Sequence, residues 1–166
     1  MNTVCAAGTG SFLDHQAARL GIPIEEFGAL ALKSRYPSHI AGRCSVFAES
    51  DLVHKQQMGQ GVEDIISGLC DALVRNYLNN LGKGKEILAP VVFQGGVAAN
   101  EGIKAALEKA LDLEVVVPGY YHGMGAIGAA ILARMAMKDK DCSSFRGFAL
   151  SEFDYQAGTF ECDGCP

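Results

Sequence analysis

The chain has 166 residues and a formal net charge of −5, with 49% hydrophobic and 20% charged residues. This length is enough for one hydrophobic core, and an acidic chain without a basic stripe argues against nucleic acid as a partner. The sequence contains no apolar run near the roughly 20 residues that a membrane span needs. Polar residues follow Met1 directly, without the pattern of a secretory signal. We therefore expect a cytoplasmic protein that does not enter a membrane.

The first half of the chain reads mainly as helices. Apolar spacing predicts a helix over 11–20, and Pro23 opens a second over 23–34. A loop over 35–42 leads into a short β-like stretch over 43–47. A helix then follows to about residue 61. The clearest helix spans 62–82, with Ile65, Ile66, Leu69 and Leu73 on one face and Gly82 as its end.

The second half alternates strands and helices. Strands are predicted over 89–96 and 113–118, and helices over 97–112 and 123–138. Apolar strands separated by helices indicate an α/β fold with a parallel, helix-covered sheet. The pattern fades after residue 140. We therefore divide the chain into a lobe over 1–140 and an extension over 141–166, which ends just after a CxxC and suggests an excised fragment.

Two glycine turns are candidates for a phosphate or nucleotide site. The turn GTGS, from Gly8 to Ser11, comes directly before a helix, where backbone N–H groups can hold an anion. The alternative is an ordinary helix start with Ser11 as its cap. The pair Gly95–Gly96 ends a predicted strand and turns into a helix, which is where ligands gather in open α/β sheets. A tight strand-to-helix connection explains the same pair without a ligand.

A third glycine-containing segment, from Gly123 to Ala130, predicts a helix with a face free of bulky side chains. Such a face either packs closely on another helix or allows hinge motion, and packing alone is the simpler interpretation. The sequence has no GxxxxGK[ST] loop, and no GxGxxG follows a strand.

The six cysteines are Cys5, Cys44, Cys70, Cys142, Cys162 and Cys165. In a chain that is not a small secreted protein, metal ligation, redox chemistry or burial explains them better than disulfides. Cys70 lies among apolar residues of the 62–82 helix and is predicted to be part of the core. Cys142 carries no signal.

Taken in chain order, the motifs CAAGTGSFLD, RCSVFAESD, FQGGVAANEGI and GMGAIGAA closely resemble one family. It comprises the ATP-dependent activators of 2-hydroxyacyl-CoA dehydratases and the related benzoyl-CoA reductase ATPase components. The resemblance covers about residues 1–137. It implies a ribonuclease H-like lobe of the superfamily that contains acetate and sugar kinases, heat-shock seventy chaperones and actin.

The resemblance also implies site residues and cofactors. Cys5 and Cys44 match ligands of a [4Fe-4S] cluster that is shared across a homodimer. Gly8, Thr9, Gly10 and Ser11 match the second phosphate loop, and Gly95 and Gly96 match the adenosine motif, for ATP with Mg²⁺. Gly125 and Gly128 lie in a connecting hinge helix. The implied partner is a 2-hydroxyacyl-CoA dehydratase or a related reductase, and the implied chemistry is ATP-linked electron donation.

Polar residues and histidines near these motifs are further candidates for a functional role. Glu49, Ser50 and Asp51 are placed either for hydrogen bonding around Cys44 or simply as solvated residues at a helix start. The histidines His15, His54 and His122 are best explained as surface residues.

The chain departs from the family in lacking the DxGS-like first phosphate loop. No catalytic residue is therefore assigned, and we expect weak or undetectable ATPase activity from this polypeptide alone. Cys162 and Cys165 supply only two of the four ligands that a metal site usually needs. Two other functions stay open, namely a kinase-like nucleotide-binding lobe and a non-catalytic dimerisation module of a larger protein.

Overall fold

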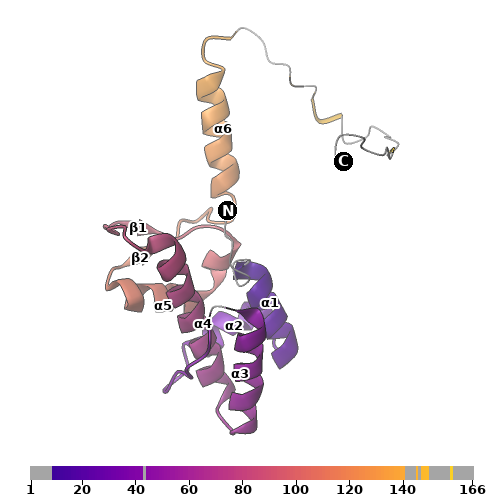
Figure 1. Ribbon diagram of the computed structural model, residues 1–166. Coiled ribbons are helices and arrows are strands. Elements are labelled where there is room, and N and C mark those ends of the chain that lie inside the picture. Colours follow the sequence, from indigo (N-terminus) through magenta and orange to yellow (C-terminus); the bar gives the residue numbers. More distant parts are fainter. Residues whose placement is uncertain (1–8, 43, 141–144, 146, 150–157, 159–166) are drawn as a thin grey trace, which may run out of the picture. The chain divides into compact units, whose positions relative to one another are not determined.

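A computed structural model describes residues 9–42, 44–140, 145, 147–149 and 158. The chain divides into two compact units, Met1–Gly128 and Ala129–Pro166 (Figure 1). Among its described residues, the first unit contains five α-helices, a π-helical turn, a 3₁₀ helix, two short strands and the beginning of a sixth α-helix. All the candidate nucleotide and cluster residues that the structure describes belong to this first unit.

The first three helices follow the predicted order with one correction. Helix α1 spans Thr9–Leu20 and α2 spans Ile24–Ala31, with Gly21 and Pro23 between them as expected. Helix α3 spans Ser45–Gln57, so the β-like stretch predicted over 43–47 is wrong. Within the described residues of that stretch, Cys44 alone lies before the helix, and its backbone angles are extended. Val46 and Phe47, whose β-prone side chains prompted the prediction, lie exposed on the first turn of the helix.

Helix α4 spans Val62–Tyr77 and is the longest in the described part of the chain. It continues into a π-helical turn, η2, over Leu78–Gly82, so the helical region ends at the predicted glycine. Helix α5 spans Glu101–Leu111. Figure 1 shows α4 beside α2 and α5, and α4 packs against both helices. Asn100 caps α5 by accepting a hydrogen bond from the Ile103 N–H at 3.0 Å.

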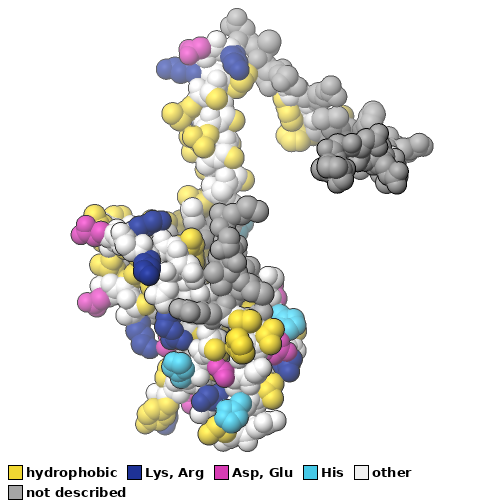
Figure 2. Space-filling view, in the orientation of Figure 1, with side chains coloured by type: hydrophobic (Ala, Val, Ile, Leu, Met, Phe, Trp, Pro, Cys, Tyr) yellow, Lys and Arg dark blue, Asp and Glu magenta, His cyan; other side chains and the backbone are white. Residues whose placement is uncertain are grey.

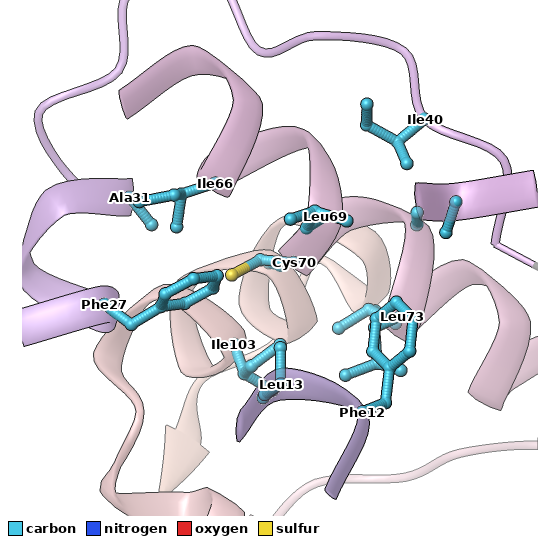
Figure 3. Packing of buried hydrophobic residues seen from close by; sticks show 14 of the residues in the cluster. Phe12, Leu13, Phe27, Ala31, Ile40, Ile66, Leu69, Cys70, Leu73 and Ile103 are labelled. Carbon is cyan, nitrogen blue, oxygen red and sulfur yellow. The ribbon is translucent and has the colours of Figure 1, made fainter. Parts of the chain in front are cut away.

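The core forms where α1, α2, α4 and α5 meet. Figure 3 shows Phe27 of α2 beside Cys70 of α4, with Leu69 and Ile103 close by. Phe27 and Leu69 are completely buried. Burial of each such side chain contributes about 2–3 kcal/mol of stability. Packing between these helices therefore fixes the relative positions of the segments that they carry.

The sheet has two strands, β1 at Val91–Val92 and β2 at Val115–Val116, which pair in parallel as predicted. Both strands are shorter than the expected 89–96 and 113–118. Val115 is buried against the core, but Val92 and Val116 are 52% and 45% exposed. Among the described residues, the face of the sheet that carries Val92 and Val116 is therefore open, and the opposite face packs on the core.

Helix α6 spans Met124–Ala136 and has no buried residue. Apolar side chains lie exposed along it (Figure 2), among them Ile131, Leu132 and Met135. A Cβ added at Gly125 or Gly128 would meet no atom within 4 Å. The close packing expected of this small-residue face is therefore absent among the described residues. No helix in the described ranges has the length and apolarity that crossing a membrane requires.

Candidate functional site

The described part of the GTGS turn, Thr9 to Ser11, belongs to helix α1. Gly8 lies outside the described residues, and the helix begins at Thr9, so Gly10 and Ser11 belong to its first turn. Ser11 is thus inside the helix, which corrects the reading of Ser11 as its cap. The first four N–H groups of a helix have no acceptor within the helix, and together with the helix dipole they favour an anion.

The second glycine turn connects β1 to a 3₁₀ helix, η3, over Gly96–Ala99. Gly95 has φ +99°, a conformation that an L side chain rarely adopts, and its N–H donates to the Tyr121 carbonyl at 2.8 Å. Gly96 has no neighbouring atom within 4 Å of an added Cβ. The backbone at Gly96 is therefore open to a ligand.

These two turns meet at one hollow of about 500 Å³, here called the nucleotide hollow. Its lining includes Gly10 and Asp14 from α1, Ile24 and Glu25 from α2, and Gly96 and Val97 from η3. A Cβ added at Gly10 would lie 3.8 Å from Cγ2 of Val97, so the two glycine motifs approach closely. Of the six predicted nucleotide residues, the structure places Gly10 and Gly96 on this hollow.

Gly95 lies instead on an apolar hollow of about 520 Å³ beside the sheet, together with Phe93, Leu73 and Tyr77. Gly96 and Val97 border both hollows. Gly96 and Val97 therefore lie between the two hollows, whereas Gly95 borders only the hollow beside the sheet.

Asp14 and Glu25 are two lining residues that the sequence motifs did not single out. Both side chains are exposed, and they bring two carboxylates to the hollow. Carboxylates repel bare phosphate oxygens, but they accept hydrogen bonds from hydroxyl groups and ligate magnesium. Because Asp14 and Glu25 are far from Gly96 in the sequence, local motifs could not predict that these residues share one hollow.

Cys44 is the residue immediately before α3, and it is half-buried with a free thiol. A thiolate here would face the N-terminal end of a helix, which stabilises negative charge. Cys5 lies outside the described residues. Its placement relative to Cys44 therefore stays a prediction.

The loop that leads to Cys44 is held tightly against α4. A Cβ added at Gly68 would lie 2.0 Å from the Ser38 carbonyl oxygen, and one at Gly42 would lie 2.5 Å from that of Ala72. Helix and loop thus touch backbone to backbone at two points. The Asp51 Oδ2 of α3 also accepts a hydrogen bond from the Ala41 N–H at 2.7 Å.

Glu49, Ser50 and Asp51, the polar residues singled out near Cys44, each make a contact that the sequence did not predict. Asp51 holds the cysteine loop as described above, and Glu49 forms an ion pair with Arg19, which links α3 to α1. The Ser50 hydroxyl donates to the Val46 carbonyl at 2.9 Å. Glu49 and Asp51 therefore connect the Cys44 helix to its surroundings, rather than being simply solvated.

The other cysteines differ in accessibility. Cys70 is 1% exposed, and burial raises the pKa of its thiol to about 12, with a further contribution from Asp71. It is a core residue, as predicted, and unsuited to act as a thiolate ligand. Cys142, Cys162 and Cys165 lie outside the described residues. Within the described ranges, no group of three or more His, Cys, Asp or Glu side chains is arranged to hold a metal ion.

The predicted surface histidines are exposed in the structure. His15 lies on α1, His54 on α3 and His122 in the turn before α6. Among the described residues, the hollows are lined without them.

Comparison with known proteins assigns the family. Residues 1–133 match the BadF/BadG/BcrA/BcrD ATPase family. The chain belongs to this family. The assignment confirms the resemblance drawn from the four motifs, and it covers the whole of the first unit.

Two relatives of this ATPase family show how much of such a protein the chain represents. It is 37% identical over 133 residues to the (R)-2-hydroxyglutaryl-CoA dehydratase activating ATPase of Acidaminococcus fermentans, covering 80% of this chain and 51% of that protein. It is 35% identical over 133 residues to the 2-hydroxyisocaproyl-CoA dehydratase activator of Clostridioides difficile, covering 80% and 50%. The chain thus spans about half the length of the curated relatives it matches.

A solved structure confirms the fold. The activator of the 2-hydroxyisocaproyl-CoA dehydratase from Clostridium difficile with bound ADPNP matches with a TM-score of 0.74 at 30% identity. The match covers 95% of this chain and 55% of that one. The ATPase-family chain therefore has the α/β fold of the actin, heat-shock seventy and sugar-kinase type that its motifs predicted.

Proposed function

We propose that this chain is the ATP-binding lobe of an activator of a 2-hydroxyacyl-CoA dehydratase, or of a related benzoyl-CoA reductase-type enzyme. The observation that supports this most directly is the approach of Gly10 and Gly96 around one hollow. Relatives at 35–37% identity carry activator names, and the solved relative holds an ATP analogue. The proposal places the protein in the cytoplasm.

In this proposal, Gly8, Thr9, Gly10 and Ser11 hold the phosphates of ATP at the start of α1. Gly95 and Gly96 present bare backbone to the adenosine part. Asp14 and Glu25 line the nucleotide hollow on the α1 and α2 side. Their carboxylates suit the hydroxyl groups of the sugar or a Mg²⁺ bound to phosphate, because bare phosphate oxygens would be repelled.

We further propose that Cys5 and Cys44 provide two ligands per chain to a [4Fe-4S] cluster shared with a second copy. A cluster of this type takes four thiolates and supplies one-electron chemistry. Cys44 fits such a role, because it is accessible and lies at a helix start, whereas the buried Cys70 does not. Val46 and Phe47 beside Cys44 are 63% and 66% exposed, which suits an interface between two copies.

Nucleotide binding is tested by filling the hollow. Gly96→Val places a side chain where the backbone is open, so we expect ATP or ADPNP affinity to fall at least about tenfold, the effect of losing about 1.4 kcal/mol. Isothermal titration calorimetry measures the affinity, and circular dichroism verifies the fold. Gly125→Val is the control, because that glycine is also open but lines neither hollow. Equal affinity in both variants would count against the nucleotide site.

The cluster is tested by anaerobic reconstitution with iron and sulfide. We expect one cluster per two chains, with loss of iron and of visible absorption in Cys44→Ala and Cys5→Ala. Cys70→Ala serves as the control and should retain the cluster, because Cys70 is in the core. ATP binding without any iron would favour a kinase-like lobe or a dimerisation module instead.

A further inference from the structure

A third hollow, of about 630 Å³, lies along the flank of α4 and its π-helical turn. Its lining consists of Gly42, Ala72, Arg75, Asn76, Asn79, Asn80 and Lys83. It shares none of these residues with the nucleotide hollow. We call it the amide hollow, after its three asparagines.

The spacing of the lining residues follows the helix surface. Arg75, Asn76, Asn79, Asn80 and Lys83 are separated by one, three, one and three positions, which places them on one face. Asn79 and Asn80 belong to the π-helical turn η2, a rare conformation that is frequent at functional sites. The structure thus concentrates polar side chains where the helix changes its hydrogen-bond pattern.

Hydrogen bonds order this polar face. The Asn80 Nδ2 donates both to the Asn76 backbone carbonyl at 2.8 Å and to the Asn76 Oδ1 at 2.7 Å. The Arg75 Nη2 donates to the Ile40 carbonyl at 3.0 Å, which anchors the guanidinium over the loop before Cys44. That bond uses one of the five N–H donors of arginine, so the others are available to a ligand.

The charge of the hollow is positive. Two cationic side chains line it, and among the described residues no carboxylate does. Neither Arg75 nor Lys83 forms an ion pair within the described part of the chain. The helix end itself carries partial negative charge from its carbonyl groups, so side-chain donors have to supply the attraction for an anion.

We propose that the amide hollow binds a phosphate-type oxyanion, either free phosphate or the phosphomonoester end of a larger molecule. Phosphate oxygens accept from the guanidinium of Arg75, the ammonium of Lys83 and the carboxamide N–H groups of the asparagines. The donors available here come from Asn76 and Asn79, because both side-chain N–H groups of Asn80 bond to Asn76. A concave site with neutral amides between two cations favours a small anion with several oxygens over a flat acidic surface. The anion would then lie next to Gly42, two residues before Cys44.

The test uses the 166-residue chain labelled with ¹⁵N and titrated with inorganic phosphate at constant ionic strength. We expect saturable shifts of the amide signals of Gly42, Asn79, Asn80 and Lys83. Arg75→Gln and Lys83→Gln should each raise the apparent Kd about tenfold, which corresponds to the loss of one charge-assisted hydrogen bond. Lys33→Gln is the matched control, because Lys33 is an exposed cation that lines none of the three hollows and should leave the Kd unchanged.

A second arm with phenyl phosphate distinguishes the source of the anion. Tighter binding than inorganic phosphate at the same signals assigns the hollow to an ester end, and equal or weaker binding assigns it to free phosphate. Gly96→Val should leave this binding unchanged, so a failed nucleotide site and a failed amide hollow give different results.

Three outcomes would overturn the proposal. They are shifts confined to Gly10, Ser11 and Gly96, the absence of saturable shifts, and an unchanged Kd in Arg75→Gln/Lys83→Gln. If the variant that carries both Arg75→Gln and Lys83→Gln loses stability in urea but keeps its Kd, the two cations serve only to offset the partial negative charge at the end of the helix.

Discussion

Cys44 and Cys70 show how the same residue type acquires opposite chemistry from its surroundings. Cys44 is half-buried at the end of the loop before α3, whereas Cys70 lies between Phe27 and Ile103 in the core. Because deprotonation would leave a charge in an apolar site, the pKa of Cys70 rises to about 12. Position in the fold, rather than spacing in the sequence, separates a ligand candidate from a packing residue.

This difference predicts thiol reactivity. In a variant with Cys5, Cys142, Cys162 and Cys165 replaced by serine, we expect one thiol, Cys44, to react rapidly with Ellman's reagent in the native state. The second should react only after unfolding, because Cys70 is buried and protonated. Cys44→Ser in the same background should abolish the fast phase. Two fast-reacting thiols would contradict the buried position of Cys70.

Gln16 is a buried polar residue whose side-chain amide lacks hydrogen bonds among the described residues. It is completely buried on α1, and neither its Nε2 nor its Oε1 has a hydrogen-bond partner among the described residues. We expect Gln16→Leu to raise the free energy of unfolding by about 1–2 kcal/mol, because the desolvation cost of the amide is removed. Urea denaturation measures the change.

Gln57→Leu on α3 provides the comparison, since Gln57 is exposed and its replacement should change stability by less than about 0.5 kcal/mol. A loss of stability in Gln16→Leu would show that the amide makes a stabilising interaction, which contradicts the prediction.

At the scale of elements, the close contact between α4 and the Ser38–Cys44 loop requires glycine. Gly68→Ala would drive a Cβ into the Ser38 carbonyl, so we expect a loss of about 3 kcal/mol in unfolding free energy. Gly125→Ala, in the open helix α6, should instead raise stability by up to about 1 kcal/mol through helix propensity. Thermal unfolding of the two variants tests the contrast, which similar destabilisation by both would contradict.

The segment just before this loop, from Ser34 to Tyr36, is held by a carboxylate of α4. Asp64 of α4 accepts hydrogen bonds from the Ser34 hydroxyl at 2.7 Å and from the Tyr36 N–H at 3.0 Å. These bonds, Ser34 first, lower the pKa of Asp64. The carboxylate therefore stabilises the fold above the pKa of an unfolded aspartate, about 3.9, and this contribution is lost as the pH falls through the lowered value.

We expect Asp64→Asn to lower stability at neutral pH and to remove part of the stability loss on acidification. Urea midpoints between pH 7 and pH 3 measure this, with Asp139→Asn as a control on an exposed residue. An unchanged pH profile would show that the Ser34 bond does not stabilise the charged form.

The predictability of these elements from sequence depends on how local their causes are. The helical period over 62–82 predicted the start of α4 and the glycine end of its helical region, because its burial pattern repeats along one strip. The β-like prediction over 43–47 was wrong. Val46 and Phe47 favour strands by residue type, but they lie exposed on the first turn of α3 because other residues of this helix pack on the core. The contacts of Asp51 and Asp64 with distant loop backbone leave no trace in local patterns.

The candidate site was predictable in part for the same reason. Motif order identified Gly10 and Gly96, whose approach follows from the strand-to-helix connection and the position of α1. Asp14 and Glu25 reach the hollow only through the packing of α1 and α2, which no motif encodes. The apolar hollow beside Gly95 likewise depends on how α4 and α5 flank the sheet.

At the scale of the whole molecule, the core formed by the described residues ends at Val115. Its buried cluster runs from Phe12 to Val115, and all of it belongs to the first unit. Removal of residues 141–166 should therefore change the unfolding free energy of the first unit by less than about 0.5 kcal/mol. Urea denaturation of the shortened and full chains measures this, and a clear loss of stability on shortening would show that the extension completes the core.

The backbone contact between α4 and the loop before Cys44 has a consequence for any attempt to redesign this protein. A thiol at the end of a loop would ordinarily be repositioned by lengthening or loosening that loop. Here the backbone of the loop lies directly on α4, because Ser38 packs on Gly68 of the helix and Gly42 packs on Ala72. A redesign that moves Cys44 by changing this loop therefore also has to change the backbone contacts of Ser38 and Gly42 with α4.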